Sequence, residues 1–253
     1  MKVTFLGTGT SQGVPIIGCD CIVCQSQNPK DKRLRCSILI EVEDVSIVID
    51  TGPDFRQQML KANNRKLDAV LFTHAHMDHT AGLDDVRAYN YIHQKPMPVY
   101  ADDITITTLK NQFSYIFSEK KYPGIPQINL NQISNKSFKV EELNIIPIEV
   151  MHHKLPVKGF RIKDFTYITD ANFISEQEKG KIKGSKVLVL NALRKTDHIS
   201  HFTLQQTIDL SQELKVEKTY LTHISHQMGL YDEVSTELPN NINLAYDGLT
   251  ITV

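Results

Sequence analysis

The segment LFTHAHMDHTAG contains four potential metal ligands within six residues, namely His74, His76, Asp78 and His79. They directly follow an apolar run, residues 69–72, that is typical of a buried strand. In an extended segment alternate side chains share a face, so His74 and His76 can bind one ion together. Asp78 and His79 are adjacent and point differently, which suits a second ion. Imidazole nitrogen and carboxylate oxygen favour zinc, manganese or iron over calcium.

A second group of potential ligands lies in GCDCIVCQ, which contains Cys19, Cys21 and Cys24. Three thiols at this spacing suit a structural zinc site, which takes Cys₃His or Cys₄ ligands. A redox disulfide between Cys21 and Cys24 is the alternative, but such a pair usually opens a helix after a strand, and this one lies in a loop. The candidates for a fourth ligand are Cys36, by proximity in sequence, and His226, in THISHQ.

The elements that must position these ligands alternate between strands and helices. Strands are predicted at residues 2–6, 37–42, 46–50, 69–72, 144–150, 160–163, 165–169, 187–190, 219–222, 243–245 and 249–253. Helices are predicted at residues 55–62, 83–89, 104–117 and 203–214. Because both halves mix the two, we expect an α/β fold with two mixed sheets packed together and helices outside. No Pro/Gly/Ser-rich linker divides the chain, which predicts one domain over residues 1–253.

Between the first strand and the next, residues 7–36 form a long irregular stretch that contains the three clustered cysteines. A loop of this length inside a compact domain is usually functional or held by something, and a metal would hold it. The basic run of Lys30, Lys32, Arg33 and Arg35 at its end is interpreted as a solvated loop. His93 and His198 are likewise interpreted as solvent-facing.

The composition excludes several classes of protein. With 253 residues, of which 41% are hydrophobic, the chain can bury a core without disulfides, so its four cysteines are free for other roles. A formal charge of −1 provides no basic field to attract nucleic acid. We find no signal peptide and no apolar run near the roughly 20 residues that a membrane helix needs. We therefore expect a cytoplasmic protein with reduced thiols, no membrane association and no nucleic-acid partner.

The HAHMDH cluster resembles the HxHxDH motif of the metallo-β-lactamase superfamily, whose αββα sandwich carries metal ligands on loops at one edge. The resemblance implies three further ligands after later strands, and the sequence offers His152 or His153, Asp170 and His223. His152 is favoured over His153 because it stands three residues before a Leu, as in the family. By resemblance, His74, His76 and His152 bind one metal. Asp78, His79 and His223 bind the other, and Asp170 bridges the two.

Two elements resemble one branch of that superfamily, GTGTSQGVPIIGCDCIVC near the start and LTHISHQ near the end. They resemble the PhnP-like phosphodiesterases, which open phosphoribosyl 1,2-cyclic phosphate in the carbon–phosphorus lyase pathway. The resemblance implies a structural zinc on Cys19, Cys21, Cys24 and His226, with Cys36 left as a buried thiol. It also places His201 near the scissile phosphate, where it could stabilise the phosphorane or protonate the leaving oxygen. The start of a helix would lower the pKa of His201.

The predicted function is the opening of a small cyclic phosphate ester by a metal-bridging hydroxide, with Asp78 and His201 as catalytic residues. The implied cofactors are two catalytic divalent metals, zinc or manganese with iron also accepted, and one structural zinc. A small phosphorylated substrate is the expected partner, and a homodimer is left open. The alternatives are a tRNA 3′-processing enzyme and a cofactor-biosynthesis protein of the pyrroloquinoline quinone type. A di-iron reductase is disfavoured because its relatives have Glu where this chain has His76.

Overall fold

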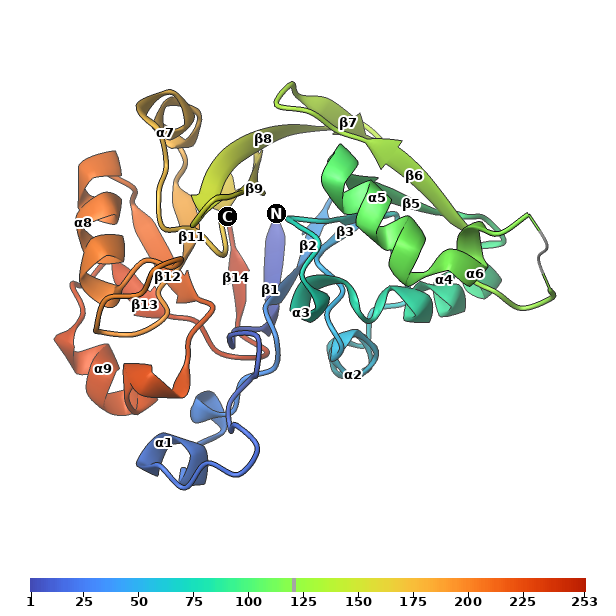
Figure 1. Ribbon diagram of the computed structural model, residues 1–253. Coiled ribbons are helices and arrows are strands. Elements are labelled where there is room, and N and C mark those ends of the chain that lie inside the picture. Colours follow the sequence, from blue (N-terminus) through green and yellow to red (C-terminus); the bar gives the residue numbers. More distant parts are fainter. Residues whose placement is uncertain (120–121) are drawn as a thin grey trace.

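Two β-sheets face each other across an apolar core (Figure 1). The computed structural model describes residues 1–119 and 122–253, and within these ranges each sheet has seven strands. In spatial order the first sheet consists of β14 (Thr250–Thr252), β1 (Lys2–Gly7), β2 (Ser37–Val42), β3 (Val45–Ile49), β4 (Ala69–Leu71), β5 (Met97–Ala101) and β6 (Ile128–Gln132). The second consists of β13 (Ile242–Leu244), β12 (Lys218–Thr222), β11 (Val187–Asn191), β10 (Phe165–Tyr167), β9 (Leu155–Ile162), β8 (Leu143–His152) and β7 (Phe138–Val140). Each sheet contains both parallel and antiparallel pairs.

The central strands β2 and β3 of the first sheet place apolar residues on both faces because both faces are covered. In β2, Ile38 and Ile40 point into the core between the sheets, whereas Leu39 packs in the layer beneath the helices. In β3, Ile49 lies in the core and Val48 on the helix side. This explains the near-continuous apolar runs, which are typical of a sheet buried on both sides.

Helices lie outside both sheets, which confirms the predicted αββα sandwich (Figure 1). On the side of the first sheet are α2 (Phe55–Ala62), η2 (Leu83–Val86), α4 (Arg87–His93), α5 (Asp103–Gln112) and α6 (Ser114–Phe117). On the side of the second are α7 (Glu176–Ile182), α8 (Leu204–Leu214) and α9 (Tyr231–Glu237). Short helices near the candidate sites are α1 (Ile22–Gln25), η1 (Pro29–Asp31), α3 (Met77–Thr80) and η3 (His226–Met228). Among helices in the described ranges, none combines the length and apolarity needed to span a bilayer.

The backbone of residues 7–10 joins the two sheets at one edge. Gly9 forms isolated bridges with Arg35 on one side and Ile224 on the other. The Ile224 N–H donates to the Thr8 carbonyl at 2.9 Å, and the Thr10 N–H donates to the Ile224 carbonyl at 3.2 Å. This connection fixes the segment that directly follows His223, one of the predicted ligands.

The basic run at residues 30–35 differs from its interpretation as a solvated loop. Arg33 is buried, and its Nη1 donates to the Thr8 hydroxyl at 2.8 Å and to the Ala245 carbonyl at 2.6 Å. Arg35 forms an ion pair with Asp54 at 3.2 Å. These cations hold the chain segments around the site together because their donors match carbonyl and carboxylate groups on neighbouring loops.

Candidate metal centre

The predicted ligands all lie at or after strand ends at one edge of the sandwich. His74, His76, Asp78 and His79 follow β4 of the first sheet, with His79 inside α3. His152 is the last residue of β8, and Asp170 and His223 follow β10 and β12 of the second sheet. The two sheets therefore contribute side chains to the same place.

Contacts among these side chains bring the predicted ligand sets together. His76 Nδ1 lies 2.9 Å from His74 Nε2, and the His76 and His152 rings are 5.3 Å apart between centroids. Asp170 Oδ2 lies 3.2 Å from both His79 Nε2 and His223 Nδ1. The side chain predicted to bridge thus touches ligands that follow strands of both sheets.

Two groups of closely spaced potential ligand atoms differ from the ligand sets that were predicted for the two ions. The ligand atoms of His74, His79 and Asp170 lie within 4.8 Å of one another, as do those of His152, Asp170 and His201. Asp170 belongs to both groups, which suits a shared ligand. His201, expected to face the substrate, lies directly among the ligand atoms, with Nε2 3.2 Å from His223 Nε2. Which side chain binds which ion stays a prediction.

The surroundings of His79 fit a cation. Its buried Nε2 lies 3.2 Å from oxygens of both Asp78 and Asp170 but forms no hydrogen bond among the described residues. Burial alone would lower the pKa of His79, yet the carboxylates of Asp170, Asp78 and Asp50 raise it well above its usual value. A buried polar atom without a hydrogen bond beside several carboxylates is the setting that a metal ion neutralises.

Hydrogen bonds to two histidines leave the opposite ring nitrogen free to bind a metal. The Ser200 carbonyl can only accept, so His152 Nδ1 donates to it at 2.9 Å and Nε2 keeps its lone pair. Asp50 Oδ2 lies 2.7 Å from His79 Nδ1 and fixes that ring in the same way. The neighbouring His153 is exposed, and its backbone N–H donates to Asn172 Oδ1 at 2.8 Å. The geometry therefore favours His152 over His153.

Asp50 is a site residue that the sequence analysis missed. It is fully buried, and besides His79 it accepts hydrogen bonds from the Thr73 N–H and the Thr73 hydroxyl, both at 2.8 Å. Its φ of 64° is in the left-handed region, as are those of Asp170 and His223, both at 54°. Each of these residues follows a strand, so the chain turns sharply where it presents a site side chain. The available signal was an aspartate at a strand end before Thr51-Gly52.

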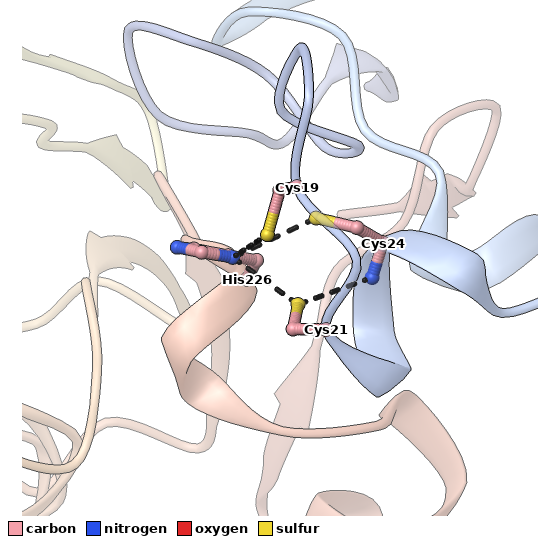
Figure 2. Close-up of side chains that lie close together, drawn as sticks. All are labelled: Cys19, Cys21, Cys24 and His226. Carbon is pink, nitrogen blue, oxygen red and sulfur yellow. Dashed lines mark hydrogen bonds between the residues drawn. The ribbon is translucent and has the colours of Figure 1, made fainter.

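The three clustered cysteines meet His226, at the start of η3 (Figure 2). Their sulfur atoms lie 3.4, 3.3 and 3.6 Å from His226 Nδ1, in the order Cys19, Cys21, Cys24. Tetrahedral zinc with its usual bond lengths would place sulfur and nitrogen ligands about 3.6 Å apart, so the group fits that ion.

Two residues were candidates for the fourth ligand, and His226 is the one that lies with the three thiols. Cys36 lies against Thr222 and His223 instead. The sulfur of Cys36 accepts a hydrogen bond from the His223 N–H at 3.1 Å and lies 3.1 Å from the Thr222 hydroxyl. Burial raises the pKa of the Cys36 thiol to about 12. This thiol therefore stays protonated and supports the backbone of a predicted metal ligand.

A cavity of about 290 Å³ opens onto the centre. It is lined by Thr10, Ser11, His76, Asp78, His152, Asp170, Leu193, His198, Ser200, His201 and His223. No Lys or Arg lines it among the described residues. His198 is partly exposed and lies on the wall of this cavity, a location that the sequence did not predict.

The pKa of His201 has a different main cause from the one expected. Burial is the main cause of the lowering of this pKa to about 3, and the neighbouring His223 contributes to the same shift. The first residue of α8 comes three positions later, at Leu204, and its N-cap is Thr203. The predicted direction of the shift agrees with this value, but burial rather than the helix terminus is its principal source.

Comparison with known proteins agrees with this architecture. Residues 46–224 match the family model described as a beta-lactamase superfamily domain. The crystal structure of a diphosphatase from the PhnP family is 37% identical, with a TM-score of 0.93 over 100% of this chain and 97% of that one. An octanoyltransferase from Porphyromonas gingivalis is 39% identical over 98% of this chain and 51% of its own length. A ribonuclease Z from an Exiguobacterium species is 25% identical over 64% of the chain and 48% of its own length.

The chain spans about half the length of these two curated relatives, whereas it covers nearly all of the diphosphatase. The family model covers most of the chain, including every predicted catalytic-centre ligand from His74 to His223. The fold, the ligand-bearing strand ends and these matches lead to one assignment. The chain belongs to the metallo-β-lactamase superfamily, within its PhnP-like branch.

Proposed function

We propose that this metallo-β-lactamase-fold hydrolase is a phosphodiesterase that opens a small cyclic phosphate ester, of the phosphoribosyl 1,2-cyclic phosphate kind. The observation that carries the proposal is the cavity of about 290 Å³, which is lined by predicted metal ligands and has no Lys or Arg on its described wall. A phosphodiester carries a single negative charge, which bound cations can neutralise without a further basic side chain. The modest volume suits a small molecule.

Seven side chains are proposed to hold two divalent cations, namely His74, His76, Asp78, His79, His152, Asp170 and His223. When bound, such a pair supplies a water of lowered pKa and neutralises charge on phosphate oxygens. Asp78 is held ionised for this role. Burial alone would raise its pKa, but the neighbouring His79 lowers it overall. Cys19, Cys21, Cys24 and His226 are proposed to bind one structural zinc.

His201 is proposed to move a proton at Nε2. This atom lies 3.5 Å from Asp170 Oδ1, on the cavity wall, so a phosphate bound between the ligands would be within its reach. Ser200 Oγ, 3.3 Å from His201 Nδ1, holds the other side of the ring. From this position Nε2 can donate to the leaving oxygen of the ester as the ring opens.

The test uses purified protein loaded with manganese or zinc. We expect hydrolysis of bis(p-nitrophenyl) phosphate and of ribose cyclic phosphate, and at most weak hydrolysis of the monoester p-nitrophenyl phosphate. An Asp170→Asn variant is the matched control, and we expect it to lose both phosphodiesterase activities. If the metal-loaded protein turns over neither phosphodiester, the proposal is wrong.

Two activities named for relatives are not extended to this chain. Octanoyl transfer belongs to a protein of which the chain spans 51%. A ribonuclease activity is disfavoured because the described wall of the cavity has no Lys or Arg side chain to bind a nucleic-acid backbone. A cytoplasmic location and a homodimer stay predictions.

A further inference from the structure

We propose that His198 is a specificity residue, which donates a hydrogen bond from Nε2 to a hydroxyl group on the non-reacting part of the substrate. Arg194 acts as its positioning residue. The inference rests on the proposed phosphodiesterase function and names the second feature of the substrate that the cavity recognises, a sugar hydroxyl.

His198 lies where it can meet a substrate without binding a metal. It lines the cavity, and its ring centroid is 5.0 Å from that of His201. It belongs to neither of the catalytic ligand groups found among the described residues. His198 therefore lies next to a side chain proposed to act on the phosphate, but outside the groups proposed to bind metal.

The hydrogen bonds of His198 fix which nitrogen carries the proton. The Ser200 N–H donates to Nδ1 at 3.3 Å, and a backbone N–H can only donate, so Nδ1 carries a lone pair. The ring hydrogen is then on Nε2, which has no hydrogen-bond partner in the described part of the protein. The cavity wall thus contains an imidazole ring, that of His198, whose orientation is fixed at Nδ1 and whose Nε2–H can donate to a ligand.

Apart from Asp78 and Asp170, which are proposed to bind metal, the cavity lining carries no carboxylate and no Lys or Arg in the described ranges. The hydroxyl groups of Thr10, Ser11 and Ser200 line the same cavity as His198. Neutral donors and acceptors recognise neutral polar groups, and a site built to hydrogen-bond a hydroxyl rejects analogues that lack it. A sugar ring attached to the phosphate matches this chemistry better than an aromatic ester does.

Arg194 holds the loop that carries His198. Its guanidinium donates to the Asp197 carbonyl at 2.6 Å, to the Thr196 carbonyl at 3.2 Å and to Gln227 Oε1 at 2.7 Å. Gln227 directly follows His226, so the loop is tied to the segment that meets the three thiols. A Lys has a single nitrogen and cannot reproduce this fork of three bonds.

The test compares two substrates in the metal-loaded enzyme, ribose cyclic phosphate and bis(p-nitrophenyl) phosphate, which has no hydroxyl group. For His198→Ala we expect KM for the ribose ester to rise about tenfold, the loss of one hydrogen bond, with kcat within about threefold. KM for bis(p-nitrophenyl) phosphate should not change. Calorimetric binding of ribose 5-phosphate should weaken by a similar factor, and His198→Asn, which keeps a donor, should recover part of the loss.

Arg194→Lys should give the same selective effect on the ribose ester. The matched control is Lys195→Ala, an exposed cation on the same loop that pairs with Glu237 at 2.6 Å, and it should behave as wild type. Equal losses on both substrates, or no loss on either, would overturn the inference while leaving the phosphodiesterase proposal intact. If wild type turns over neither ester, the proposed function fails, and unaltered ribose 5-phosphate binding by His198→Ala would then refute the specificity role separately.

Discussion

Asp50 and His79 form the most completely buried polar pair of the site. Both side chains are inaccessible to solvent, and the 2.7 Å contact joins Asp50 Oδ2 to His79 Nδ1. Thr73 donates twice to the same carboxylate, which prevents it from rotating away. Asp50 therefore sets the orientation of His79 and increases the basicity of its other ring nitrogen, although Asp50 is not one of the predicted metal ligands.

Replacing Asp50 should weaken metal binding although no ligand is lost. We expect Asp50→Asn to bind the catalytic metals about 10–100-fold more weakly, because the second carboxylate oxygen becomes an amide donor facing other donors. Metal titration of the apoprotein measures this. Asp68→Asn is the control, since Asp68 is similarly buried and accepts from the Ser46 N–H at 2.9 Å, away from the centre. Equal affinity in both variants would refute the role of Asp50.

His201 can be tested apart from the ligands. If it moves a proton, His201→Ala should lower kcat by about 10²–10⁴-fold while the metal content per chain stays that of wild type. Elemental analysis of the same preparation gives the metal content. Because His201 lies among the ligand atoms, a loss of about one metal ion in the variant would instead identify it as a ligand.

The positions of site residues in the fold were predictable where one short segment carries the information. In the HAHMDH segment, four potential ligands and the spacing between them lie within six residues. Asp170 and His223 directly follow predicted strands. Asp50 was missed because its partner is 29 positions away and no local pattern links the two. His198 was not predicted as a site residue because only the fold of its loop brings it to the cavity wall.

At the scale of elements, the N-terminal segment around α1 has little core of its own. Its buried apolar cluster consists of Val14, Val23 and Cys24, far fewer side chains than the clusters beneath the sheets. It extends away from the sandwich in the view of Figure 1. Hydrophobic burial at this scale is small, so beside hydrogen bonds such as that from the Tyr231 N–H to Asp31 we expect the group of thiols and His226 to hold the segment.

Breaking that contact should loosen the segment and leave the sandwich folded. We expect Cys21→Ser to lose about one metal ion per chain, from about three to about two, and to become cleavable by protease within residues 11–30. Ile17→Ser is the control, because this exposed side chain lies in the same loop and binds nothing. A variant that keeps its metal content and its protease resistance would exclude the structural zinc.

Burial alone did not decide which elements were predictable, because β5 was missed although Met97, Val99 and Ala101 are buried. Strands β2, β3 and β11 are mostly apolar runs and were predicted within a residue or two. The edge strand β6, INLNQ, was missed because its polar residues have no apolar run to reveal it. The predicted helix at 104–117 is two helices, interrupted at Phe113, where φ is −111° and ψ is 42°.

At the scale of the whole molecule, the candidate catalytic centre lies between the two sheets. His74 and His79 follow a strand of the first sheet, and Asp170 and His223 follow strands of the second. Asp170 is fully enclosed among these histidines, and its contacts to His79 and His223 both measure 3.2 Å. A cation bound here is therefore also a cross-link between the halves of the sandwich.

Metal binding should consequently stabilise the whole fold. At a free metal concentration about 100 times Kd, binding to the native state alone adds about 3 kcal/mol to the free energy of unfolding, or roughly 6–12 °C in Tm for a chain of this size. Differential scanning calorimetry before and after chelation measures the shift. Asp170→Asn should lose most of this gain, whereas Cys21→Ser should keep the part that comes from the catalytic pair. An unchanged Tm after complete chelation would mean that the sheets hold together without the metals, and the centre would then serve chemistry alone.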